Sequence, residues 1–166
     1  DVGAQGLDDL LRLDRIAQRF RHLAAALVDR DGSIGWWCLP RVDSPSVFAQ
    51  LLDDGAGHFR VGPPASEAVE RSYDEDAMVL RTRFRTATGT LELTDALALG
   101  QGERGHETGA HPPHTILRRA RCLDGEVELE IDFAPRFEYG LTTPIVREVE
   151  HGVVATGGPT TLRMSA

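Results

Sequence analysis

The sequence contains no lysine, and all 18 of its basic residues are arginine. A Schiff-base lysine and a lysine ligand for phosphate are therefore excluded. The arginines are spread along a chain whose net charge is -8, and with abundant Ala, Gly and Asp they fit the coding bias of a GC-rich genome. Their number is thus no evidence of phosphate recognition, and an acidic chain without a basic cluster argues against nucleic acid as a partner.

Long apolar runs and cysteines are scarce as well. No run approaches the roughly 18 residues that a membrane-spanning helix requires, and no secretory signal is visible, so we expect a cytoplasmic protein without a membrane partner. The two cysteines, Cys38 and Cys122, match neither a disulfide framework nor a zinc pattern, and we expect two buried, reduced thiols. No P-loop or dinucleotide fingerprint is present, so we expect no cofactor.

The hydrophobic pattern changes its period near residue 22. Residues 7–20 (LDDLLRLDRIAQRF) carry apolar residues at helical spacing, with acids early and arginines late, which predicts an amphipathic helix. From His22 onward the period is two, which is typical of strands. We therefore expect a helical extension over residues 1–21 and a β-domain over residues 22–166.

Apolar runs separated by turn sequences predict antiparallel strand pairs. The runs HLAAALVD and SIGWWCLP flank RDG, residues 78–97 turn at ATG, and residues 115–137 predict a third hairpin around LDG. In the second pair, an arginine face and an acidic face could form a solvated cross-strand ladder. Weaker strands follow around Gly152 and Gly157/Gly158. The predicted fold is mainly β, an antiparallel β-sandwich or barrel with one or two short helices near the N-terminus.

Residues 32–54 (GSIGWWCLPRVDSPSVFAQLLDD) are the densest stretch of the chain. Trp36 and Trp37 are adjacent on a predicted strand and so point to opposite faces, which places one in the core and leaves the other partly exposed. An exposed tryptophan is common both as a platform for stacking sugars and as an interface anchor.

The end of this stretch combines a restricted loop with a helix signal. Arg41 and Asp43 follow Pro40, and they are interpreted either as a pair that staples the turn or as a polar contact held for a ligand. Ser44 as N-cap and Pro45 in the first turn predict a short helix, with an apolar face made of Val47, Leu51 and Leu52.

Two constellations could carry chemistry elsewhere. His106, Glu107, His111 and His114 are zinc-type ligands, but their spacing fits no regular face and their segment, residues 100–113 (GQGERGHETGAHPP), is glycine-rich. We therefore expect solvated loop histidines and no metal, with a metal-dependent enzyme as the alternative. Paired carboxylates are the signature of glycoside hydrolysis, but with 26 acids in the chain composition selects no pair.

Residues 22–164 resemble a known family over most of their length. LAAALVDRDGSIGWWCLPRVDSPSVFAQLLD is similar to the start of bacterial glycoside hydrolase family 15 proteins, the trehalase-like and glucoamylase-like enzymes, and YDEDAMVLRTRF, GTLELTDAL, RRARCLDGEVELEIDFAPRFEYG and GGPTTLRMSA follow in the family's order. The sequence departs from the family at Gly35, where relatives carry an acid, and at Val42, where they carry an aromatic residue.

The resemblance implies a non-catalytic antiparallel β-sandwich of supersandwich type, cut short, that packs on an (α/α)6 barrel. The catalytic glutamates of the family belong to that barrel, which this sequence lacks, so no catalytic residue is carried over. The parent reaction is inverting hydrolysis of an α-glucosidic bond in trehalose or a maltooligosaccharide. The expected site is a substrate-proximal or interdomain loop with Trp36, Trp37, Arg41, Asp43 and Ser44.

Two further expectations concern partners. A shortened sandwich leaves an unpaired sheet edge, through which the domain could self-associate. The alternative function is an autonomous carbohydrate-binding module that uses Trp36 or Trp37.

Overall fold

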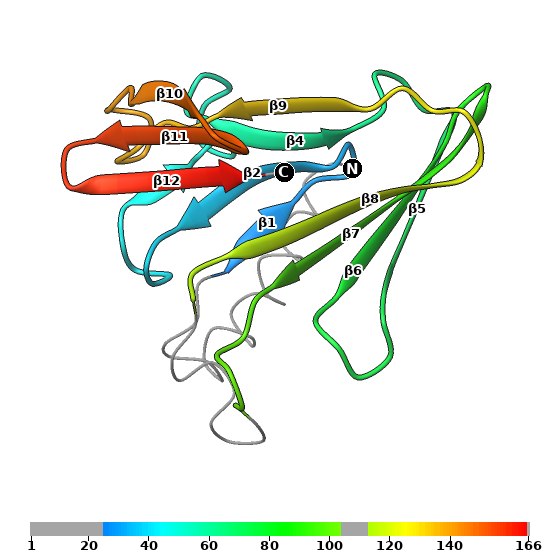
Figure 1. The fold of residues 1–166 in the computed structure, drawn as a ribbon, viewed down its shortest axis with the longest axis horizontal. Coiled ribbons are helices and arrows are strands. Elements are labelled where there is room, and N and C mark those ends of the chain that lie inside the picture. Colours follow the sequence, from blue (N-terminus) through cyan, green and yellow to red (C-terminus); the bar gives the residue numbers. More distant parts are fainter. Residues whose placement is uncertain (1–24, 104–112, 166) are drawn as a thin grey trace.

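The computed structural model describes residues 25–103 and 113–165. Within these residues it contains strands and no helix, and the strands form three antiparallel sheets (Figure 1). This confirms the predicted mainly β, antiparallel fold. The strands are β1 (Ala26–Val28), β2 (Ser33–Cys38), β3 (Ser46–Phe48), β4 (His58–Gly62), β5 (Ala68–Tyr73), β6 (Leu80–Arg85), β7 (Gly89–Leu97), β8 (Ile116–Gly125), β9 (Glu130–Ala134), β10 (Ile145–Val149), β11 (Gly152–Gly157) and β12 (Thr160–Ser165).

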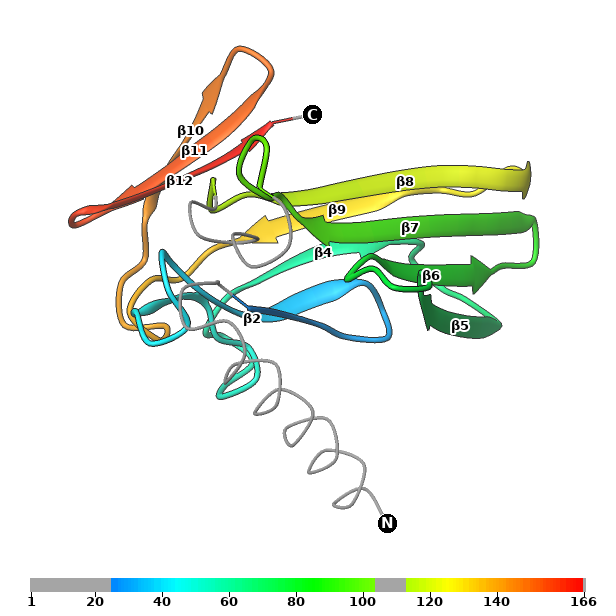
Figure 2. The ribbon, with the colours of Figure 1, turned by 90° about the horizontal axis from the view of Figure 1, so that it is seen from below.

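Two smaller sheets pack on one larger sheet. The larger sheet has the order β1-β2-β4-β9, with β3 also paired to β2, and the smaller ones have the orders β5-β6-β7-β8 and β10-β11-β12 (Figures 1 and 2). Val61 of β4 packs with residues of β6 and β7, whereas Ile34 and Trp37 of β2 pack with residues of β11 and β12. Phe59 of β4 contacts both clusters, so both smaller sheets cover the same face of the larger one.

The first hairpin forms as the RDG turn predicts. β1 pairs with β2, and the Asp29 amide donates to the Ser33 carbonyl at 2.7 Å across the turn. Gly32 has a φ of +83°, and a Cβ at this position would lie 2.2 Å from the Val61 carbonyl oxygen. Only glycine fits here, because both the conformation and the close approach to β4 exclude a side chain.

A buried arginine joins two of the sheets. Arg118 of β8 forms a 2.8 Å ion pair with Asp95 of β7, and both side chains are 5% exposed. Its Nη1 and Nη2 donate to the carbonyls of Phe59 and Gly32, at 2.6 and 2.5 Å, and the guanidinium lies 4.9 Å from the centre of the Phe59 ring. The four-stranded sheet is therefore fixed to the larger sheet by a charged group whose donors are used on both sides.

The short helix predicted from Ser44 is wrong. Residues 46–48 form β3, which pairs with β2 through Trp37–Phe48 and Cys38–Ser46, and turns follow. Val47, Phe48 and Ala49 are all buried, whereas the expected apolar face at Leu51 and Leu52 is 59% and 63% exposed. A run of consecutive buried residues is typical of a strand covered on both faces. The burial of these residues therefore decides the conformation, although Ser44 and Pro45 favour the start of a helix.

The hairpin predicted over residues 115–137 is wrong as well. Both of its strands form, but β8 pairs with β7 and β9 pairs with β4. The LDG residues are the end of β8 and remain paired with β7, and residues 126–129 cross to the larger sheet. Alternation defines the inner face of a strand and does not define its neighbour. The pairing of β6 with β7 and the strands near Gly152 and Gly158 are confirmed.

Three other predictions have different outcomes. Both cysteines are free thiols, but only Cys38 is buried; Cys122 is exposed at the end of β8, so its predicted burial is wrong. The predicted helix over residues 7–20, the boundary near residue 21 and the residues His106, Glu107 and His111 lie outside the described residues. In the described part of the chain, no helix is long and apolar enough to cross a membrane.

Candidate functional site

The two tryptophans of β2 lie on opposite faces, as expected for a strand. Trp37 is 4% exposed and stacks on Phe48, with ring centroids 6.1 Å apart. Its indole nitrogen is buried without a hydrogen-bond partner. Trp36 is partly exposed and packs against Tyr139, with centroids 6.0 Å apart and planes tilted by 36°. Trp36 is therefore the tryptophan that a partner could reach.

Beyond Trp36 and Trp37, the 39–46 loop carries the other predicted site residues on the surface. The Leu39–Pro40 peptide bond is cis. Arg41 pairs with Asp43 at 2.6 Å, with side chains 55% and 62% exposed, and the Arg41 amide donates to the Ser44 hydroxyl at 3.2 Å. The pair thus staples the turn, yet most of both charged groups faces solvent, where a second molecule can contact them.

Cys38, the last residue of β2, is buried directly before the loop. Burial, and then the Asp43 carboxylate, raise the pKa of this thiol, so Cys38 stays protonated at neutral pH. A protonated, enclosed thiol is a poor nucleophile. Cys38 therefore belongs to the support of the loop.

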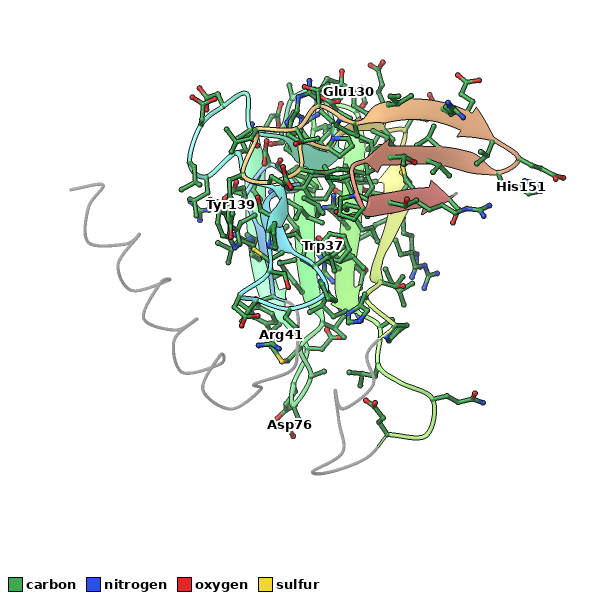
Figure 3. All side chains as sticks on the ribbon, turned by 90° about the vertical axis from the view of Figure 1, so that its left-hand side faces the viewer. Trp37, Arg41, Asp76, Glu130, Tyr139 and His151 are labelled. Atoms are coloured by element: carbon green, nitrogen blue, oxygen red, sulfur yellow. The ribbon has the colours of Figure 1, made fainter. Side chains whose placement is uncertain are left out.

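A second segment, the 137–142 turn, lies against the 39–46 loop. It was not predicted from the sequence as part of the site. Glu138, Tyr139 and Gly140 have φ values of 54°, 61° and 92°. The Glu138 amide donates to the Ser46 carbonyl at 2.9 Å, and the Tyr139 amide donates to the Ser46 hydroxyl at 3.0 Å. Figure 3 views the molecule from this end and labels both Tyr139 and Arg41. The available sequence signal was Gly140 directly after Tyr139, because glycine permits a left-handed turn.

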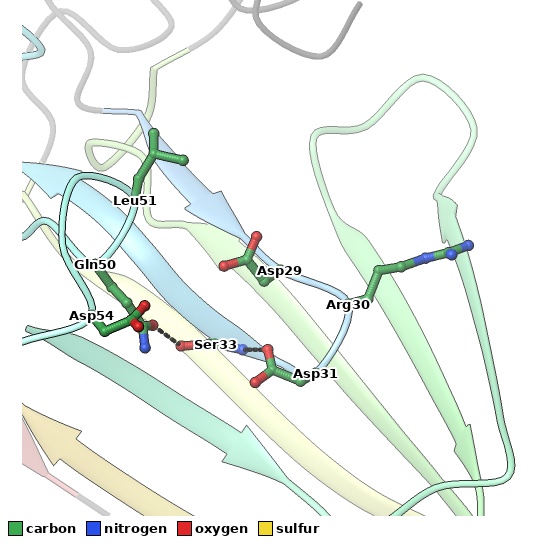
Figure 4. Close-up of a pocket in the computed structure, with 7 residues that line it drawn as sticks. All are labelled: Asp29, Arg30, Asp31, Ser33, Gln50, Leu51 and Asp54. Carbon is green, nitrogen blue, oxygen red and sulfur yellow. Dashed lines mark hydrogen bonds between the residues drawn. The ribbon is translucent and has the colours of Figure 1, made fainter. Parts of the chain in front are cut away.

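A polar hollow lies beside the other end of β2 (Figure 4). It is lined by Asp29, Arg30, Asp31, Ser33, Gln50, Leu51 and Asp54. The Ser33 hydroxyl donates to Gln50 Oε1 at 3.3 Å, and burial followed by the Asp31 charge raises the pKa of Asp29. A Cβ on Gly35 would lie 3.0 Å from Asp29 Oδ2, so a side chain at this position would crowd that carboxylate.

The two buried carboxylates of the described residues are both held by arginine. Asp95 is bound by Arg118, and Glu92 accepts from Arg83 at 2.9 Å and Arg81 at 3.1 Å. The Arg83 hydrogen bond keeps the pKa of Glu92 below its usual value. This confirms cross-strand pairing of the arginine and acidic faces, although Glu92 is buried where a solvated ladder was expected.

The histidine segment is only partly described. Within residues 25–103 and 113–165, no group of three or more His, Cys, Asp or Glu side chains is placed to hold a metal ion. Of the four predicted metal-type ligands, only His114 falls in these residues, and it is exposed.

Comparison with known proteins gives one consistent result. Residues 7–166 match the family described as trehalase-like, N-terminal. The chain is 41% identical over 123 residues to a trehalase of Mycolicibacterium smegmatis and to one of Mycobacterium tuberculosis, matches that cover 68% of this chain and 18% of each relative. Trehalase 1 of Sulfolobus acidocaldarius is 38% identical over 132 residues, which cover 79% of this chain and 21% of that protein.

The aligned region spans about a fifth of these curated relatives. No solved structure matches the chain significantly.

Proposed function

Because the chain belongs to the trehalase-like, N-terminal family, we propose that it is a non-catalytic β-sandwich domain of a glycoside hydrolase that acts on α-glucosidic bonds. In this proposal the domain packs against a catalytic (α/α)6 barrel of the same cytoplasmic polypeptide. The substrate is trehalose or a maltooligosaccharide. The match to trehalases at 41% and 38% identity is the observation that carries the proposal.

The 39–46 loop is the part of the domain that we assign to the rim of the active site. Arg41 and Asp43 present exposed, oppositely charged groups that can hydrogen-bond sugar hydroxyls. Ser44 accepts the Arg41 amide within the loop, Trp36 packs on Tyr139, and Trp37 is buried and so contributes only through the core. Neither buried carboxylate of the described residues is available as a general acid or base, because each binds arginine.

The proposal is tested by incubating the purified chain with trehalose and with maltose. We expect no release of glucose, because the acid and base belong to the catalytic part. The proposal is wrong if the chain releases glucose and this activity disappears when one Asp or Glu is replaced by Asn or Gln.

One observation favours a second function, an autonomous carbohydrate-binding module. Trp36 and Tyr139 form a partly exposed aromatic pair, and aromatic rings stack on sugars. Titration with maltooligosaccharides, followed by tryptophan fluorescence, should then saturate in the wild type and stay flat in Trp36→Ala. A flat wild-type response favours the domain without its own sugar site.

We also propose that the isolated domain self-associates through the edge strand β9. β9 pairs with β4 alone, and Ile131 on it is 52% exposed. Its acids Glu130 and Asp132 are paired with Arg60 and His58, which reduces repulsion between two copies. Sedimentation velocity should show a concentration-dependent dimer that Ile131→Lys abolishes. A species that stays monomeric, or a dimer that this change leaves intact, contradicts the edge contact.

A further inference from the structure

We infer that the 137–142 turn is the docking anchor of this domain, and that Leu141 at its tip enters an apolar pocket on the catalytic part of the longer polypeptide. The inference rests on the proposed function and adds to it the residues that hold the two parts together. It concerns a segment that the 39–46 loop does not include.

Leu141 has an unusual exposure for its type. It is 86% exposed, whereas the other exposed large hydrophobic residues of the described chain range from 40% to 66%. A leucine that makes so little contact within its own domain adds almost nothing to folding. Interfaces, by contrast, depend on a few apolar side chains that enter pockets on the partner.

The backbone holds Leu141 in a fixed position. Phe137 at the base of the turn is 1% exposed and forms a bridge with Thr142, and the Leu141 amide donates to the Glu138 carbonyl at 3.2 Å. The Thr142 hydroxyl donates to the Glu138 carboxylate at 2.8 Å. Two of the three left-handed residues are not glycine, and such conformations persist only where the surroundings enforce them. Rigid presentation lowers the entropy lost on binding.

The same turn is bonded to the 39–46 loop. Ser46 accepts both the Glu138 and the Tyr139 amides, and the Tyr139 hydroxyl lies 3.4 Å from the Ser44 carbonyl. Tyr139 also packs on Trp36. The two segments are therefore joined, and together they carry exposed apolar side chains at Leu141 and Tyr139 and exposed charged side chains at Arg41 and Asp43. Interfaces commonly combine apolar and charged side chains of this kind.

The catalytic part is a better occupant than a second copy of this chain. The relatives are about five times as long as the region they share with this chain, so most of their residues lie outside it. A second copy would have to offer Leu141 an apolar pocket, and the polar hollow beside β2 does not supply one, because its lining includes Asp29, Asp31 and Asp54. Because the turn is bonded to the loop, a partner that approaches the loop also meets Leu141.

Hydroxyl-radical footprinting tests this directly. Oxidation of Leu141 and Tyr139 is measured in the isolated chain and in the complete polypeptide, and we expect the rate for Leu141 to fall at least about tenfold in the complete polypeptide, because an anchor side chain is enclosed. Leu141→Glu should restore the oxidation of Tyr139 in the complete polypeptide. The matched control Leu123→Glu, which changes an exposed leucine of β8, should leave Tyr139 protected.

Three outcomes overturn the inference. Leu141 could oxidise at the same rate in both proteins, Tyr139 could stay protected in Leu141→Glu, or protection could already appear in the isolated chain as its concentration rises, which would identify a second copy as the occupant. The proposed function fails separately. If the complete polypeptide protects Leu141 and yet hydrolyses no α-glucoside, the anchor stands and the assigned reaction falls.

Discussion

Two arginine–aspartate pairs of similar geometry have different surroundings and therefore different effects. The Arg118–Asp95 pair is 5% exposed on both sides and has further hydrogen bonds to two backbone carbonyls. The Arg41–Asp43 pair is more than half exposed and bonds only within its own loop. Water competes with the second pair and is excluded from the first, so the first determines stability and the second remains available for binding.

The Arg118→Met variant should lower the free energy of unfolding by about 3–5 kcal/mol, because it leaves Asp95 charged, buried and unpaired. Arg41→Ala should change it by about 0–1 kcal/mol, as is usual for an exposed pair. Urea unfolding of both variants gives these values. Equal losses in the two variants would contradict the assigned roles.

Glu92 makes the fold sensitive to acid. Hydrogen bonding, first from Arg83, holds the pKa of Glu92 in the folded state below its ordinary value of 4.5. A carboxyl group whose pKa is lowered by folding contributes stability above its unfolded pKa, and this contribution is lost as the pH falls through the folded pKa. The loss of stability should therefore begin near pH 4.5 and grow at lower pH.

In Glu92→Gln this acid-dependent loss should be smaller, because the amide does not titrate. Urea unfolding at a series of pH values between neutrality and the acid transition measures it, with the exposed Glu67→Gln as the matched control. If the control flattens the pH dependence as much as Glu92→Gln does, the Arg83 contact is not its source.

The 39–46 loop and the 137–142 turn depend on each other through Ser46 and Gly140. Ser46 is buried and accepts two amides of the turn, and Gly140 lies against Ala56 with a φ of +92°. A Cβ on Gly140 would lie 2.8 Å from the Ala56 Cβ. The position of Tyr139 over Trp36 thus depends on the neighbouring Gly140 and on its close approach to Ala56.

Gly140→Ala should displace the turn and lower the free energy of unfolding by about 1–3 kcal/mol, the range for an enforced left-handed residue. Tryptophan fluorescence should shift as Tyr139 leaves Trp36. The control Gly158→Ala also has a positive φ, of 56°, but its Cβ meets nothing within 4 Å, so the fluorescence should stay as in the wild type. A Gly140→Ala protein with wild-type fluorescence would show that the two segments are independent.

Sequence periodicity predicted strands better than it predicted their partners. The β1–β2 hairpin was predictable because a short turn forces neighbouring runs to pair. β8 and β9 are also separated by only a short segment, residues 126–129, yet they join different sheets, because contacts with β7 and β4 outweigh local closure. The helix signal at Ser44 failed for the same reason, since burial of Val47 and Phe48 between neighbours decides that segment.

The site was predictable only in part. The opposite orientation of Trp36 and Trp37 follows from strand geometry, but which of them is buried depends on the three-stranded sheet that covers Trp37. Tyr139 could not be placed beside Ser44 from sequence, because 95 residues separate them and the contact depends on a turn with three left-handed residues. Long-range contacts of this kind leave no periodic signal.

The described residues form a sandwich of packed sheets that carries the 39–46 loop and the 137–142 turn. The sheets are fixed to one another by Arg118 and by clusters around Phe59. Arg41 and Tyr139 are both seen from the side of the molecule that Figure 3 faces. A site held by rigid elements keeps the geometry that catalysis requires. We propose that the domain is a platform that presents the 39–46 loop and Leu141 to a catalytic partner.

The most direct test of that account is the kcat/KM for trehalose of the complete polypeptide carrying Arg41→Ala. We predict a fall of about tenfold or more, because a group that positions the substrate at the rim is lost while the fold is kept. Arg147→Ala, which removes an exposed arginine of β10, should leave kcat/KM unchanged. A kcat/KM for Arg41→Ala equal to that of the wild type would contradict the account.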